Sequence, residues 1–257
     1  MPVDMQNPAF VANAVAGFNE VPARGPYTLG MATSALFQSL SVMDSNYTLI
    51  VNKIRRMVTD GTAAAYLPPD YRTDPVMIAG YNKQLLVMAD LLANPVVPST
   101  EVPWATGTAA RVFLLHPLSR GTVRLNKTHP LEQPILDFRP ATNPVDFDIH
   151  LAHVRYLRKI FSTATMRAYG TIEVGPGEAV AQSDAKLLAY VKEQMTLSFT
   201  HSCCTAAMLP KSKGGVVGPD LKVYGAAGLR IVDMSVLPLL PSAHLSATAY
   251  AVGEKVN

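Results

Sequence analysis

The sequence predicts an α+β fold, in which an antiparallel sheet is flanked by helices. Several segments repeat apolar residues at the three- and four-residue spacing of an amphipathic helix, and three short segments between residues 110 and 138 are strand-like. Turn residues at Gly121 and over 126–130 separate those strands, and antiparallel strands with interspersed helices are typical of the α+β class. The chain is 49% apolar and 16% charged, which excludes a disordered protein and allows a sizeable core.

The expected elements follow from local patterns along the chain. Asp74 and Pro75 form a typical helix start, an N-cap followed by proline in the first turn. Helices are expected over residues 7–20, 75–93, 146–164, 184–197 and 245–256, and strands over residues 110–116, 122–125 and 134–138. Residues 33–57 fit either a helical or a strand period, and residues 94–108 are interpreted as a connector rich in Pro, Thr and Gly.

Charge and cysteine content exclude several classes of protein. The net charge is +3 and no basic run exceeds Arg55-Arg56, which argues against a nucleic-acid partner. No apolar run reaches 18 residues, and the first residues lack the pattern of a signal peptide, so a cytoplasmic protein without membrane contact is expected. The two cysteines, Cys203 and Cys204, are adjacent and cannot join distant segments into a disulfide framework.

The glycines do not form a dinucleotide-binding motif. Gly175 and Gly177 begin a G-x-G-x-x-G pattern, but Val180 occupies the third glycine position. Gly225 and Gly228 have the wrong spacing, and no G-x-x-x-x-G-K-[ST] sequence occurs. Because the pyrophosphate of FAD needs such a turn at a helix start, the chain alone is expected to carry no cofactor.

Three ordered motifs resemble the C-terminal half of the glucose–methanol–choline (GMC) oxidoreductases, a family of FAD-dependent alcohol oxidases and dehydrogenases. The matching segments are residues 112–125, the run His201-Ser-Cys-Cys-Thr-Ala-Ala-Met-Leu-Pro210, residues 221–238, Pro241-Ser-Ala-His244 and Glu254-Lys255, with Arg24-Gly-Pro-Tyr-Thr28 upstream. The resemblance implies one substrate-binding domain over residues 1–257. Within it, residues 112–257 match the family's C-terminal region and residues 1–111 form a lead-in of helices and loops.

The resemblance also implies a pair of catalytic residues. His201 corresponds to the histidine of H-x-x-G-T and His244 to its partner, which together remove and orient the proton of an alcohol while hydride moves to the flavin. Imidazole suits this role because it titrates near neutral pH. Cys204 stands where the family has glycine. Three residues, Asp233, Ser235 and Ser246, match positions that face the flavin and are expected to be vestiges of a cofactor site.

Several other side chains are candidates for the substrate pocket or for binding chemistry. The pocket candidates are Cys203, Cys204, Thr205, Phe113 and Tyr250. The adjacent cysteines could form a nucleophile, a ligand pair or a vicinal disulfide, but small apolar packing is favoured. His116 is expected to make a structural hydrogen bond at the end of a strand. His150 and His153 have a spacing that could bind metal, but a solvated helix face is favoured and no metal is expected.

Three functions are compatible with the sequence. The favoured hypothesis is a flavin-free enzyme that uses His201 and His244 for acid/base chemistry on an apolar small molecule, by isomerisation, dehydration, cyclisation or lyase chemistry. The alternative is the C-terminal half of a split FAD-dependent alcohol oxidase or dehydrogenase, and a second alternative is a non-catalytic ligand-binding remnant. A homo-oligomer or a partner chain is expected to cover the former interdomain face.

Overall fold

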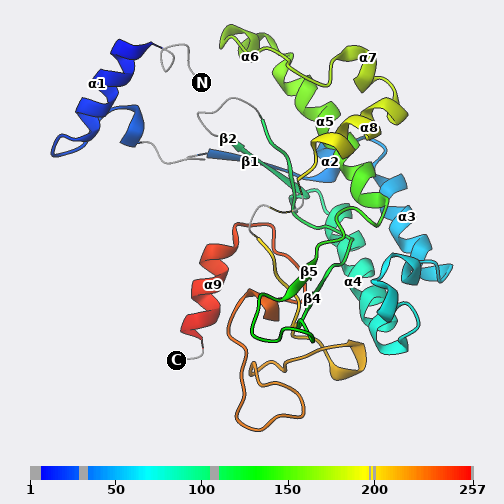
Figure 1. The fold of residues 1–257 in the computed structure, drawn as a ribbon. Helices are drawn as coiled ribbons and strands as arrows, with labels where there is room; N and C mark the ends of the chain where they lie inside the picture. Colours follow the sequence, from blue (N-terminus) through cyan, green and yellow to red (C-terminus); the bar gives the residue numbers. More distant parts are fainter. Residues whose placement is uncertain (1–6, 29–33, 105–109, 197, 199–200, 256–257) are drawn as a thin grey trace.

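The computed structural model has the predicted α+β architecture, in which helices accompany small antiparallel sheets (Figure 1). It describes residues 7–28, 34–104, 110–196, 198 and 201–255. The helices are α1 (Pro8–Phe18), α2 (Leu40–Met43), α3 (Tyr47–Thr59), α4 (Pro75–Ala93), α5 (Val145–Phe161), α6 (Ala164–Ala168), α7 (Glu178–Ala181), α8 (Asp184–Gln194) and α9 (Leu245–Glu254). Short 3-10 turns are η2 (Pro26–Thr28), η3 (Ala63–Tyr66), η4 (Pro69–Tyr71), η5 (Lys211–Lys213) and η6 (Met234–Val236).

The predicted helices are confirmed, with ends that shift by a few residues. The clearest is α4, where Asp74 accepts hydrogen bonds from the backbone N–H groups of Val76 and Met77 and Pro75 occupies the first position. Ser183 caps α8 in the same way through the N–H of Lys186, and this helix ends at Gln194, before the predicted boundary. The ambiguous region 33–57 contains α2 and most of α3.

The sheet differs from the prediction. Strands β1 (Ser34–Gln38), β2 (Thr100–Trp104) and β3 (Phe113–Leu114) form one antiparallel sheet in that order, whereas β4 (Thr122–Arg124) and β5 (Ile135–Asp137) form a separate antiparallel pair. The sequence leaves the segment of β1 ambiguous between helix and strand. It predicts a connector where β2 lies. Their pairing joins residues more than 60 positions apart, so no local pattern reveals it.

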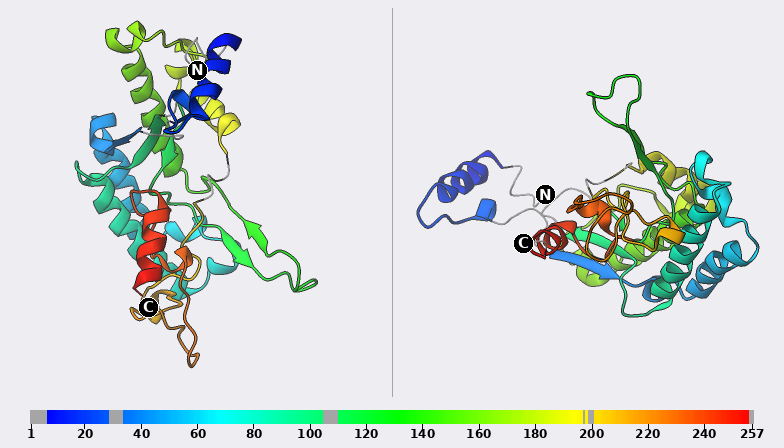
Figure 2. Two further views of the ribbon diagram at one scale, coloured as in Figure 1. Left: turned by 90° about the vertical axis from the view of Figure 1, so that its left-hand side faces the viewer. Right: turned by 90° about the horizontal axis from the view of Figure 1, so that it is seen from below.

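Helices α3, α4 and α5 enclose the main core on one side of the molecule. Its fully buried side chains include Leu40, Ile54, Leu85, Leu118 and Ile149. In Figures 1 and 2 the C-terminal helix α9 lies away from α3, and the β4–β5 pair projects from the body. A smaller cluster of Val217, Leu221 and Val236 supports the irregular C-terminal segment.

A buried carboxylate joins the segment after β3 to helix α5. Asp146 accepts hydrogen bonds from the backbone N–H groups of Leu118 and Ser119 and from the Ser119 hydroxyl. Burial raises the pKa of Asp146, and the hydrogen bonds from Ser119 oppose that rise. The side chain of Arg120 turns back to donate to the carbonyls of Pro117, Leu118 and Ser119. This network fixes the end of the segment that carries Phe113 and His116.

Within the part of the chain that the structure describes, no helix has the length and apolar character needed to cross a membrane.

Candidate active site

The structure brings His201 and His244 together from two separate segments. Their ring centroids lie 5.9 Å apart and the ring planes are tilted by 52°. His244 is the N-cap residue of α9 and His201 precedes the irregular segment that runs along η6. Backbone N–H groups of Cys204, Ala206 and Met208 donate to the carbonyls of Met234, Ser235 and Val236, in that order. Because η6 also packs against α9, these contacts hold both histidines on one side of the molecule.

A residue that the sequence analysis missed lies behind His244. Oε1 of Glu101, on β2, is 2.6 Å from Nε2 of His244. The Glu101 side chain is 3% exposed, whereas that of His244 is 56% exposed, so a buried carboxylate holds an imidazole that opens to solvent. An ionised carboxylate accepts the Nε2 proton and thereby fixes the orientation and tautomer of the ring. No sequence signal marked Glu101, which lies in the segment interpreted as a connector.

Aromatic residues flank Glu101 on the sheet. The register pairs Glu101 with Phe37 of β1 and with Phe113 of β3. Directly opposed residues in antiparallel strands project to the same face, so the three side chains form a row. Phe37 is 39% exposed and Phe113 is partly buried. The predicted pocket residue Phe113 therefore lies beside the anchor of His244, and Phe37 joins it.

His116 has the structural role that was predicted for it. Its Nε2 lies 2.8 Å from the hydroxyl of Ser242, and that hydroxyl donates to the carbonyl of Pro98. Because the Ser242 hydroxyl donates its proton to the Pro98 carbonyl, its oxygen accepts a hydrogen bond from Nε2–H of His116. Burial lowers the pKa of His116, which keeps the ring neutral. The contact anchors the turn that leads into His244.

The adjacent cysteines form a vicinal disulfide, so the favoured interpretation of small apolar thiols was wrong. Both Cys203 and Cys204 are partly exposed, and neighbouring Thr205 is exposed. Cys204 has a backbone φ of +75°, in the left-handed region that favours glycine. These three pocket candidates lie on the segment that begins at His201.

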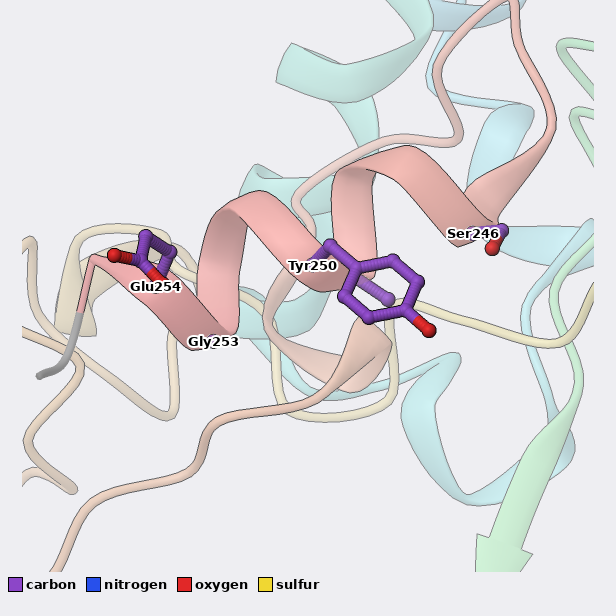
Figure 3. A pocket seen from close by; sticks show the side chains of 5 residues that line it. Ser246, Tyr250, Gly253 and Glu254 are labelled. Atoms are coloured by element: carbon purple, nitrogen blue, oxygen red, sulfur yellow. The ribbon is translucent and has the colours of Figure 1, made fainter.

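Tyr250 and Ser246 line a shallow surface pocket along α9 (Figure 3). The lining residues Ser246, Ala249, Tyr250, Gly253 and Glu254 are spaced as one helical stripe, and Tyr250 is 80% exposed. The other two flavin-facing candidates lie on or beside η6, which packs against this helix. Asp233 is exposed and accepts a hydrogen bond from the N–H of Ser235, which caps η6.

His150 and His153 do not form the expected solvated face. His153 is 1% exposed, and neither of its ring nitrogens has a hydrogen-bond partner among the described residues. Burial lowers the pKa of His150 to about 4 and that of His153 well below its usual value. No group of three or more possible metal ligands occurs in the described part of the chain. His153 is therefore a packing residue of α5, whereas His150 is half-buried.

The fold matches that of the substrate-binding domain of an oxidoreductase family. Residues 117–253 match the family model for GMC oxidoreductases. The chain belongs to the GMC oxidoreductase family, as the three sequence motifs implied.

Individual relatives agree with this assignment. A solved structure of a new fungal aryl-alcohol oxidase is 62% identical, with a TM-score of 0.92 over 98% of this chain and 42% of that chain. The FAD-dependent oxidoreductase from Chaetomium thermophilum is 36% identical, with a TM-score of 0.89 and the same coverage. Dehydrogenase xptC from Emericella nidulans is 35% identical over 229 residues, which are 89% of this chain and 36% of the relative.

The chain therefore spans less than half the length of these relatives. All three are named as oxidases, dehydrogenases or oxidoreductases, so the expected isomerase, cyclase or lyase chemistry has no counterpart among them.

The residues on and beside α9 suit the flavin end of FAD. No described side chain caps the start of α9, so its first N–H groups can donate to carbonyl oxygens of a bound ring system. Gly253 faces open space and Ala249 is small, which lets a flat group approach the helix closely. The adenosine diphosphate end needs the glycine-rich turn that the sequence lacks. Asp233, Ser235 and Ser246 are accordingly candidates to contact the flavin ring.

Proposed function

We propose that this chain is the substrate-binding part of an FAD-dependent alcohol oxidoreductase that acts on aromatic alcohols. The observation that carries the proposal is the convergence of His201 and His244, with Glu101 behind the second ring. The FAD-binding part is supplied elsewhere in the same polypeptide or by a separate chain. This places the alternative of a FAD-dependent oxidoreductase ahead of the flavin-free enzyme.

The two imidazoles perform the proton chemistry. When FAD is bound, it supplies the acceptor for the hydride that leaves the carbon bearing the hydroxyl. One imidazole takes the hydroxyl proton and the other donates a hydrogen bond to the same oxygen, which keeps the alcohol in one orientation. Because Nε2 of His244 is hydrogen-bonded to Glu101, His244 contacts the substrate through Nδ1. The buried carboxylate at Nε2 also holds the ring in one orientation, and we assign His244 as the base of the pair.

The substrate class follows from the surroundings of Glu101. Phe37 and Phe113 flank it on the sheet, so two aromatic residues lie beside the carboxylate that binds His244. An aromatic ring of a substrate can stack on or meet the edge of such side chains, which is worth about 0.5–1.5 kcal/mol per pair beyond its buried area. The 62% identity to an aryl-alcohol oxidase supports the same class.

Exposed apolar residues support a partner surface. Val123 and Leu136 on the β4–β5 pair are each more than half exposed, and Tyr250 extends from α9. Val123 and Leu136 are paired across the two strands, and adjacent exposed apolar side chains of this kind favour a contact with another protein part. We propose that the FAD-binding part of the enzyme covers it, and that self-association covers it when that part is absent.

Complementation tests the function. The chain is produced alone and together with the FAD-binding part of the 62% identical aryl-alcohol oxidase, and oxidation of benzyl alcohol is followed by dye reduction. Turnover is expected only in the mixture, with flavin bound in the mixture alone. The His201→Ala/His244→Ala double variant is the control, since it is expected to assemble and bind flavin without turnover.

Two results would overturn the proposal. The first is a flavin-loaded mixture that leaves aromatic alcohols unchanged. The second is conversion of an apolar substrate by the isolated chain without flavin, which would restore the flavin-free isomerase or lyase hypothesis.

A further inference from the structure

A disulfide between neighbouring residues lies directly after His201. Sγ of Cys203 is bonded to Sγ of Cys204, and the Cα atoms of the two residues are 3.8 Å apart. Both side chains are partly exposed, so small reductants can reach them. The sequence contains two cysteines, so a thiol reagent acts on this bond and on no other in the chain. The proton chemistry proposed for His201 and His244 does not use this bond.

The backbone of Cys204 has a conformation that suits glycine. Its φ is +75°, where the Cβ of an ordinary residue approaches the neighbouring carbonyl oxygen. Glycine adopts this region freely because it has no Cβ. The motif that the chain resembles carries glycine at this position. A residue with a side chain is therefore held where the backbone geometry disfavours it.

Cys204 lies between His201 and the segment that is hydrogen-bonded to η6. Downstream, the N–H of Cys204 donates to the carbonyl of Met234 at 3.1 Å, and Ala206 continues the contact to η6 at 2.9 Å. Upstream, His201 extends toward His244. The torsion angles of Cys203 and Cys204 thus set the direction in which the chain leaves the anchored segment, and hence the position of His201.

We propose that the Cys203–Cys204 disulfide is a positioning element for His201. The bond closes a ring through the peptide that joins the two cysteines, and this ring keeps Cys204 in the left-handed conformation that glycine would adopt without it. His201 consequently stays opposite His244. The effect on turnover rests on the function proposed above, whereas the effect on geometry does not.

Reduction releases this constraint. A dithiol reductant gives two electrons and two protons to the S–S bond, which becomes the thiols of Cys203 and Cys204, and the reductant becomes a cyclic disulfide. Free of the bond, Cys204 relaxes to negative φ and His201 turns away from His244. Hydrogen peroxide reverses the change, because it takes two electrons and two protons from the thiols and becomes two molecules of water.

Two double variants separate the bond from the backbone conformation. Cys203→Ser/Cys204→Ala and Cys203→Ser/Cys204→Gly both lack the disulfide and differ by one methyl group. Alanine is disfavoured at positive φ and glycine is not. The alanine variant is therefore expected to resemble the reduced protein, and the glycine variant is expected to resemble the oxidised one.

Histidine side-chain NMR on the chain itself reads the position of His201. The His201 resonances are expected to change on reduction and in the alanine variant, and to stay near those of the oxidised protein in the glycine variant. His129 is exposed and lies in another segment, so its resonances are the internal control. Unchanged His201 resonances after full reduction would overturn the proposal. Equal changes in the alanine and glycine variants would also overturn it.

Turnover gives a second measurement in the enzyme assembled with its FAD-binding part. The alanine variant is expected to lose about 10- to 100-fold in kcat, since displacing a catalytic group by about 1 Å has effects of that size. The glycine variant is expected to keep a kcat near that of the unmodified enzyme. A kcat equally low in both variants contradicts the proposal. An inactive unmodified enzyme contradicts only the proposed function, since NMR still decides the geometry.

Discussion

Glu101 Oε1 lies 2.6 Å from Nε2 of His244 and joins the middle strand of the sheet to the N-cap residue of α9. The carboxylate is almost fully buried and the imidazole is half exposed. A buried anchor for an exposed ring is the arrangement expected where a side chain must meet a substrate in one orientation. The strand β2 thus contributes to the site although it lies far from both histidines in sequence.

The variant Glu101→Gln tests this anchor. The amide keeps the size of the side chain but removes the carboxylate charge beside Nε2 of His244. We expect kcat in the assembled enzyme to fall about 10- to 100-fold and the pH profile of kcat/KM to shift. Glu132→Gln is the matched control, because Glu132 is exposed in the loop between β4 and β5. Unaltered kinetics in Glu101→Gln would remove Glu101 from the proposed site.

Single and double histidine variants test whether the two rings act together. His201→Ala and His244→Ala are each expected to lower kcat about 10²- to 10⁴-fold without unfolding the chain. The double variant is expected to lose little more than the worse single variant, since groups that act on one transition state are not additive. Losses that multiply, or one variant with near-full activity, would show that the rings do not form a unit. His129→Ala serves as the control for replacing an exposed histidine.

The helices could be predicted because their signals are local. Asp74 and Pro75 indicate the start of α4, and its apolar residues repeat at the helical period over the whole element. The histidine pair was found from two sequence motifs, and the structure places the rings 5.9 Å apart. Their catalytic role stays a prediction.

The missed features depend on contacts between distant segments. Glu101 and Phe37 become neighbours through pairing of β1 with β2, and residues 94–108 show only the composition of a loop. The burial of His153 likewise comes from the packing of α5 against other elements, which the i, i+3 spacing with His150 does not reveal. Adjacent cysteines are compatible with thiols and with a bond, and the sequence favoured thiols, so sequence alone could not identify the disulfide.

Replacement of Asp146 tests the buried network beside the sheet. Oδ1 accepts from the N–H of Leu118, and Oδ2 accepts from the N–H and hydroxyl of Ser119. In Asp146→Asn, the side-chain NH2 group replaces one of the two oxygens. Whichever way the amide is turned, this donor faces another N–H donor and that hydrogen bond is lost. We therefore expect the free energy of unfolding to fall by about 2–4 kcal/mol, measured by urea denaturation.

Asp90→Asn provides a surface comparison for Asp146→Asn. Asp90 is 73% exposed and pairs with Arg55, so its loss is expected to change stability by less than about 1 kcal/mol. Equal stabilities of the two variants would contradict the structural role of Asp146.

Acid sensitivity should arise from the buried histidines of α5. Burial lowers the pKa of His150 to about 4 and lowers that of His153 well below its usual value, whereas both titrate near 6.5 in the unfolded chain. Between these values the unfolded state binds protons that the folded state does not. The free energy of unfolding therefore decreases as the pH falls through this window, by at most about 1.4 kcal/mol per pH unit for each histidine.

Replacing His153 with phenylalanine should flatten this dependence. The variant His153→Phe removes one titrating group. The ring nitrogens of His153 have no hydrogen-bond partner among the described residues, so the substitution changes side-chain packing and breaks no hydrogen bond to them. Urea denaturation at pH 7.0, above the window, and at pH 5.0, within it, is expected to show a loss of roughly 2 kcal/mol or more in the unmodified chain. The loss is expected to be smaller in the variant, in which His150 and the buried His116 still titrate. His129→Phe changes an exposed histidine and is expected to keep the full loss. The same pH dependence in all three proteins would show that other groups govern the acid response.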